Sequence, residues 1–189
     1  MFLLASALSL VFLTAFCAVH LIRVDLSFSK DAMSKYGIGD KGWLLSIGFS
    51  SIGSAQIVLS VGLADFYIFS LGNALLIIAG IGAVVVSLFK MELPKTTMAG
   101  HIHTLGAAIQ FTLFPFALVI LNNIVSVTAP SFFTTVVYCM NFLLIAVMAA
   151  FVIAGKVHNS AYFGFIQKMN ILLMSVWVLI ISLYFTDLF

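Results

Sequence analysis

Charged residues are scarce in this chain: they make up 7% of its 189 residues. Water-soluble domains are about one-quarter charged, because water must solvate their surfaces. With 63% hydrophobic residues and a mean hydropathy of +1.26, a water-exposed particle of this composition would present large apolar patches and aggregate. The composition therefore predicts that lipid surrounds most of the side chains.

The motifs of soluble enzymes are also missing. The sequence has no phosphate-binding glycine loop, HExxH, CxxC pair or Gly-x-Ser-x-Gly elbow. The net charge of +2 is too small to indicate nucleic acid as a partner. The two cysteines, Cys17 and Cys139, lie inside apolar runs near opposite membrane faces, so we expect free thiols. The length fits a single transmembrane domain, residues 1–189.

Six apolar runs are each close to the ~20 residues that cross a hydrocarbon core of roughly 30 Å. They are continuous rather than alternating, and they are about twice as long as a barrel strand, which predicts helices. The expected fold is all-α, a polytopic bundle of six transmembrane helices. The predicted spans are 2–22, 43–64, 68–89, 100–122, 132–155 and 164–185.

All eight Lys and Arg residues fall on one side of the expected membrane. Four lie in 23–42, two lie in 90–99, Lys156 lies in 156–163, and Lys168 lies just inside the sixth span on the same side. The positive-inside rule places these three loops in the cytoplasm and both termini on the opposite side. The four histidines gather near the same face, so any chemical site is expected there.

The fourth span carries a stripe of small and polar residues at spacings of three and four. Such a stripe lets another helix approach closely while the polar side chains find partners. Asn141 in the fifth span lies at a depth comparable with that of Gln110, and we expect the two to hydrogen-bond. A structural role is the favoured interpretation, and lining a ligand cavity is the alternative. The stripe comprises Gly100, His103, Gly106, Ala107 and Gln110.

The sequence leaves three interpretations of His103 open: a hydrogen-bonded histidine of the bundle, a catalytic or proton-handling group, or a metal or haem ligand. His101 lies about 200° around the helix from His103, so a regular helix cannot aim both at one metal. His20 with His103 is a weak metal-binding candidate. Because the histidines are shallow and no second span supplies one at mid-membrane depth, we expect no haem and no other cofactor.

Two segments, SKYGIGDKGWL (34–44) and TMAGHIHTLGA (97–107), resemble a bacterial membrane family known as domain of unknown function 998. They correspond to the polar loop that runs into the second span and to the Gly-x-x-His start of the fourth. The resemblance implies a six-helix protein of the bacterial inner membrane with no agreed activity. It also implies that Asp25, Ser34 and Tyr36 of the first loop are neighbours of Gly100 and His103.

Three functions compete. The lack of soluble mass and of a complete catalytic constellation favours a non-catalytic accessory or assembly subunit, with membrane lipids and other membrane subunits as partners. The second is an interfacial enzyme or lipid-binding protein, in which His103 is the acid or base and Asp25 or Glu92 orients it. The third is a small transporter, although no charged residue lies at mid-membrane depth. We predict the accessory subunit and leave open whether the protein is an enzyme.

Overall fold

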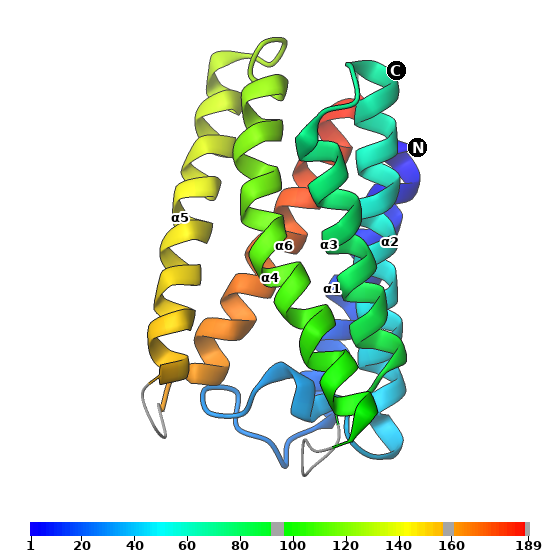
Figure 1. The fold of residues 1–189 in the computed structure, drawn as a ribbon, viewed down its shortest axis with the longest axis vertical. Helices are drawn as coiled ribbons and strands as arrows, with labels where there is room; N and C mark the ends of the chain where they lie inside the picture. Colours follow the sequence, from blue (N-terminus) through cyan, green and yellow to red (C-terminus); the bar gives the residue numbers. More distant parts are fainter. Residues whose placement is uncertain (92–96, 157–160, 188–189) are drawn as a thin grey trace.

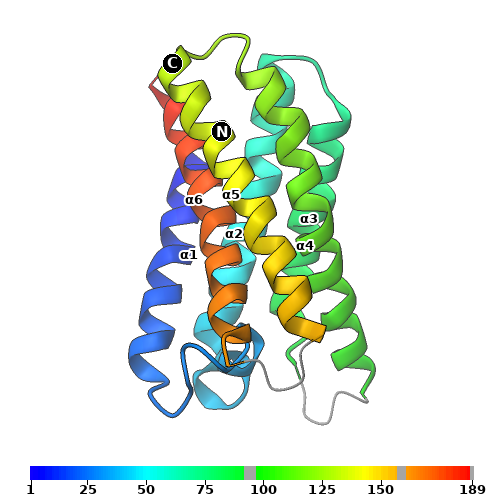
Figure 2. The ribbon, with the colours of Figure 1, turned by 90° about the vertical axis from the view of Figure 1, so that its left-hand side faces the viewer.

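The computed structural model describes residues 1–91, 97–156 and 161–187. Within these residues the chain forms six α-helices and two short 3₁₀ helices, without a β-strand. The α-helices run alternately up and down in one bundle (Figures 1 and 2). Each is long and apolar enough to cross a membrane. The prediction of an all-α polytopic bundle is confirmed.

The predicted spans agree with the helices to within three residues at every end. The largest shift at a helix start is in α3, which begins three residues later than predicted. Ser70 and Asn73 form a capping box there, in which the Ser70 and Asn73 side chains each accept the other's backbone N–H. The helices are α1 (Phe2–Ile22), α2 (Trp43–Phe66), α3 (Leu71–Leu88), α4 (Met98–Val125), α5 (Ser131–Lys156) and α6 (Phe163–Thr186), with η1 (Met33–Gly37) and η2 (Asp40–Gly42) before α2.

Glycines let α2, α3 and α4 pack backbone against backbone. A Cβ atom added to Gly53 of α2 would lie 2.5 Å from the carbonyl oxygen of Gly80 in α3. A Cβ on Gly82 of α3 would lie 2.7 Å from the carbonyl oxygen of Gly106 in α4. These distances are far below van der Waals contact, so the small residues set how closely the helices approach.

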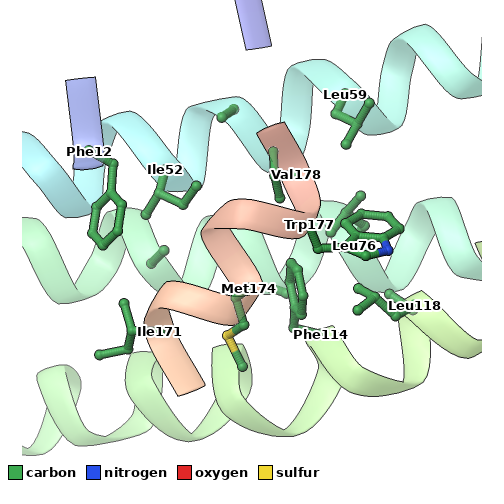
Figure 3. Packing of buried hydrophobic residues seen from close by; sticks show 14 of the residues in the cluster. Phe12, Ile52, Leu59, Leu76, Phe114, Leu118, Ile171, Met174, Trp177 and Val178 are labelled. Carbon is green, nitrogen blue, oxygen red and sulfur yellow. The ribbon is translucent and has the colours of Figure 1, made fainter. Parts of the chain in front are cut away.

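The core of the bundle is centred on Trp177 of α6. Its ring meets that of Phe114 edge to face, with centroids 5.8 Å apart, and both lie beside Leu76 and Leu118 (Figure 3). The indole Nε1 donates to Asn122 Oδ1 at 3.0 Å. The N–H group that tryptophan brings into the apolar core is therefore satisfied.

The loop between α1 and α2, residues 23–42, covers one end of the bundle (Figure 1). Met33 and Tyr36 in it are buried, each 1% exposed. Lys168 of α6 is fully buried beneath this loop and donates from Nζ to the carbonyl oxygens of Phe28 (2.8 Å) and Asp31 (2.6 Å). Nζ also lies 4.8 Å from the Tyr36 ring centroid, within the range of a cation–π contact. This one side chain joins the first loop to the start of α6.

The start of α1 and the end of α6 lie at one end of the bundle, and the first loop lies at the other (Figures 1 and 2). The helix ends that flank 90–99 and 156–163 lie at the loop's end as well. The described basic residues therefore share one end, as the charge distribution predicts. That this end faces the cytoplasm of a bacterium stays a prediction.

Cysteine labelling tests the orientation. With Cys17 and Cys139 replaced by serine, Asp65→Cys is expected to react with a membrane-impermeant maleimide in intact cells. Lys30→Cys should react only after the membrane is opened, because it lies in the first loop. Labelling of Lys30→Cys in intact cells would place this loop outside and contradict the prediction.

Candidate functional site

A cavity of about 350 Å³ lies inside the bundle, under the first loop and between α4, α5 and α6. We call it the inner pocket. Its volume falls at the lower end of the range of small-molecule sites, ~300–1,000 Å³. Its polar lining consists of Ser34, His103, Thr104, Gln110, Thr112 and Gln167, and its larger apolar lining includes Phe49, Met91, Phe111, Met148, Phe151 and Phe163.

A second hollow, of about 440 Å³, lies between α4 and α5. We call it the outer groove. Its lining is almost wholly apolar, and it includes Phe116 and Val152, which are 59% and 50% exposed on the outside of the bundle. Phe111, Thr112 and Met148 line both hollows. The inner pocket therefore adjoins a groove on the outer surface of the bundle, with these three side chains between them.

The course of α5 accounts for the position of the two hollows. α4 and α5 are joined by a turn and diverge toward the first loop in the view of Figure 1, and α5 packs against α6. Near the turn, Asn122 Nδ2 donates to the carbonyl oxygen of Val137 at 3.5 Å. Further along, the two helices are separated by the side chains that line the groove.

His103 forms part of the wall of the inner pocket. It is buried, and its Nδ1 lies 2.7 Å from the carbonyl oxygen of Phe89. Because a carbonyl only accepts, Nδ1 carries the hydrogen and donates it. The hydrogen bond to Phe89 agrees with the first of the three interpretations, a hydrogen-bonded histidine of the bundle. His103 also lines the inner pocket.

Gln110 also lines the inner pocket, but its expected bond to Asn141 is not formed in the described residues. The prediction is wrong because the two residues lie at different depths. The Asn122–Val137 contact makes Asn141 level with position 118, which is about 12 Å along the helix from Gln110. The Oδ1 atom of Asn141 has no hydrogen-bond partner.

Asp25 does not line the inner pocket, because it pairs with its near neighbour. Arg23 Nε lies 2.9 Å from Asp25 Oδ1, and the guanidinium also donates to the backbone of Ile38. The hydrogen bonds from Arg23 hold the pKa of the Asp25 carboxyl below its usual value. Glu92, the other proposed partner of His103, lies outside the described residues, as does His158.

Further charged and aromatic groups hold the first loop in place rather than face the pocket. The Lys35 ammonium, with help from the Ser27 N–H, lowers the pKa of the Asp31 carboxyl. Burial raises the pKa of the Tyr36 phenol. The Tyr36 ring lies 4.5 Å from that of His20, whose Nδ1 donates to Phe16. Tyr36 is thus a packing residue of the loop.

The remaining histidine and glycine candidates are placed at the start of α4. His101 is exposed, on the side of α4 away from the inner pocket. Gly100 is buried, and its N–H donates to the Thr97 side chain that caps the helix. No group of three or more His, Cys, Asp or Glu in the described ranges could hold a metal ion. That the protein uses no cofactor stays a prediction.

Sequence reasoning missed several residues of the site. Gln167 accepts the Met33 N–H at 2.8 Å, so it joins α6, η1 and the pocket. Phe151 and Phe163 line the pocket from α5 and α6, and no local motif marks them. For Lys168 the sequence did give an indication. A lysine inside a predicted membrane span needs polar partners in the protein, and Lys168 has them in the carbonyl groups of the first loop.

The fold and the site define a polytopic helical membrane protein with a ligand-sized pocket beside an apolar groove on its outer surface. The family model described as "Protein of unknown function (DUF998)" matches residues 6–184, and the chain belongs to this family. The resemblance of the two sequence segments is therefore confirmed. Comparison with curated proteins and with solved structures gives no match.

Proposed function

We propose that this protein binds a membrane amphiphile that moves from the bilayer through the outer groove into the inner pocket. The observation that carries the proposal is that the two hollows adjoin at Phe111, Thr112 and Met148, whose side chains line both. An apolar chain would occupy the groove, and its polar head would lie against His103 and Gln110. This is the lipid-binding alternative considered above. The accessory-subunit and transporter hypotheses rest on sequence features and stay predictions.

The energetics assign different roles to the two hollows. Lipid tails are about as apolar as leucine, so moving a chain from bilayer to groove gains little hydrophobic free energy. Affinity must therefore come from packing and from the polar wall. A polar head that leaves the hydrated interface needs a partner in the pocket, and a hydrogen bond with Gln110 avoids the cost of a buried unsatisfied group, about 1–3 kcal/mol.

Binding is also supported by the composition of the inner pocket, whose lining is mainly apolar with a few polar side chains, as is typical of sites that hold small molecules.

Closing the groove tests the proposal. Ala149 lines the outer groove and is exposed, so Ala149→Trp should fill the opening without disturbing the core. We expect wild-type protein released gently from nanodiscs to retain a lipid-sized adduct in native mass spectrometry. Ala149→Trp should weaken this retention about tenfold, equivalent to ~1.4 kcal/mol.

Ile153→Trp is the matched control, because Ile153 lies one turn away on α5, is 64% exposed and does not line the groove. It should retain the adduct as the wild type does. A wild type without any adduct, or equal retention in both tryptophan variants, would refute the proposal.

A further inference from the structure

We infer that the amphiphile is an uncharged lipid whose head is a free hydroxyl group, the head that diacylglycerols and isoprenoid alcohols share. This inference rests on the proposed function and names its ligand class. Two features of α4 carry it: the depth at which the two hollows adjoin, and the hydrogen-bonding groups that this helix leaves open there.

The two hollows adjoin near the middle of the bundle's depth. Thr112, which lines both, lies close to the midpoint of α4, about 20 Å from either end of the helix. Met148, which also lines both, lies about 7 Å from the midpoint of α5. A hydrocarbon core is roughly 30 Å thick, so a head that passes these residues crosses hydrocarbon. That route is costly for an ionised head and much less costly for an uncharged one.

Two polar side chains at this depth have no hydrogen-bond partner among the described residues. The Gln110 side chain is 2% exposed and lines the inner pocket, but its amide is unpaired. The Thr112 hydroxyl is also unpaired, although Thr104 of the same helix donates to the carbonyl oxygen of Gly100 at 2.8 Å. Since a buried amide without a partner is costly, a polar ligand group beside Gln110 would relieve that cost.

Pro115 leaves a third group open. Proline has no N–H, so the carbonyl oxygen of Phe111, four residues earlier, lacks the donor that a regular helix supplies. Phe111 and Pro115 both line the outer groove. The Phe111 carbonyl oxygen and the Gln110 amide oxygen only accept hydrogen bonds, whereas the Gln110 NH₂ group donates and the Thr112 hydroxyl does both. A ligand that satisfies this set must donate as well as accept.

A hydroxyl group meets both requirements. It donates one hydrogen bond, accepts others and is uncharged. An ether, ester or ketone oxygen only accepts, so it would leave the open oxygens of Gln110 and Phe111 without a donor. A phosphate or ammonium head would carry charge into the hydrocarbon. The hydroxyl head therefore lies beside Gln110, with its tail along the outer groove.

Three probes with one tail test the assignment: oleyl alcohol, oleyl methyl ether and oleyl phosphate, offered at equal mole fractions. The full chain is measured by native mass spectrometry in micelles of lauryldimethylamine oxide, a detergent without a hydroxyl group. We expect the oleyl alcohol adduct to exceed each of the other two by about tenfold. Dioleoylglycerol and geranylgeraniol, offered next, separate the two sources of the hydroxyl head, and binding of neither would overturn the assignment.

Gln110→Leu should lower the oleyl alcohol adduct about tenfold, because it removes the amide and keeps a side chain of similar size. Thr112→Val loses only a hydroxyl at an exposed position, and it should lower the adduct by a smaller factor. Asn141→Leu is the matched control. It removes a buried amide that lines neither hollow and whose Oδ1 is already unpaired, so the adduct should be unchanged.

The outcomes separate the two claims. If the ether or the phosphate predominates and Ala149→Trp abolishes that adduct, the hydroxyl assignment is overturned while the proposed function stands. If Gln110→Leu and Asn141→Leu bind oleyl alcohol equally well, the amide has no role and the assignment is overturned. If Ala149→Trp weakens the binding of none of the three probes, both claims fail.

Discussion

Lys168→Met is expected to lower the apparent midpoint of thermal unfolding in detergent by about 10 °C. Methionine preserves most of the side-chain length but removes the ammonium. The carbonyl oxygens of Phe28 and Asp31 would then be buried without their donor. Each unsatisfied group costs about 1–3 kcal/mol, and for a protein of this size 1 kcal/mol corresponds to about 2–4 °C.

The same substitution should release the first loop. Residues 23–42 contain four basic residues, so trypsin cleavage within this segment reports whether the loop is held against the bundle. We expect Lys168→Met to be cleaved much faster than the wild type. Lys156→Met is the control, because it removes the same charge from an exposed position outside the loop and leaves all four cleavage sites of 23–42 in place. Equal melting and equal cleavage of the two variants would show that Lys168 does not hold the loop.

The second large effect is expected where α3 and α4 touch. In Gly106→Ala, the new Cβ would lie 2.8 Å from the carbonyl oxygen of Gly82, and a backbone atom cannot rotate away. The helices must separate, and overpacking of this kind costs about 1–3 kcal/mol. Gly82→Ala should have a similar cost, because its Cβ meets the carbonyl of Gly106. The thermal midpoint in detergent measures both.

The double variant distinguishes this account from a general intolerance of alanine. Once one substitution has separated the helices, the second should cost little, so the combined loss should be smaller than the sum. Gly155→Ala is the control: its Cβ would lie 3.6 Å from the Phe163 ring, an ordinary contact, and alanine favours the helix. Strictly additive losses for Gly82 and Gly106, or a loss as large for Gly155→Ala, would contradict the backbone-contact explanation.

Hydropathy was sufficient to predict the fold, because in lipid the length and continuity of an apolar run determine each helix. The boundaries depend on local chemistry that hydropathy does not describe. The start of α3 is the example, since the Ser70–Asn73 capping box places it three residues inside the apolar run, which begins at 68. The small-residue stripes were equally informative, because close backbone approach requires glycine whatever the partner helix is.

The site was predictable only where one helix determines it. The spacing of His103 and Gln110 places both on one face of α4, and both line the inner pocket. The contributions of Phe151 and Gln167 depend on how α5 diverges from α4 and how α6 fills the space, which no local pattern describes. The predicted pairing of Gln110 with Asn141 was wrong for the same reason. It took the depth of each residue from its position in its own span, whereas the true relative depth depends on how far α4 and α5 are shifted along one another.

The expected pairing of Asp25 with His103 shows a second reason why contacts in the site could not be predicted from the sequence. Two residues on one membrane face can meet only if neither has a nearer partner. Arg23 lies two positions from Asp25 in sequence and binds both of its carboxylate oxygens at 2.9 Å. The Asp25 side chain, 60% exposed, therefore lies at the surface of the loop beside Arg23 and is not part of the pocket that His103 lines.

The central claim is that the inner pocket and the outer groove together hold one bilayer-derived molecule. An experimental density map of the protein in a lipid nanodisc tests it most directly. We predict elongated non-protein density that runs from the groove past Thr112 and Met148 and ends beside Gln110. A map of equal quality in which side chains close the passage at these residues, or in which the inner pocket holds only separate water-sized peaks, would contradict the claim.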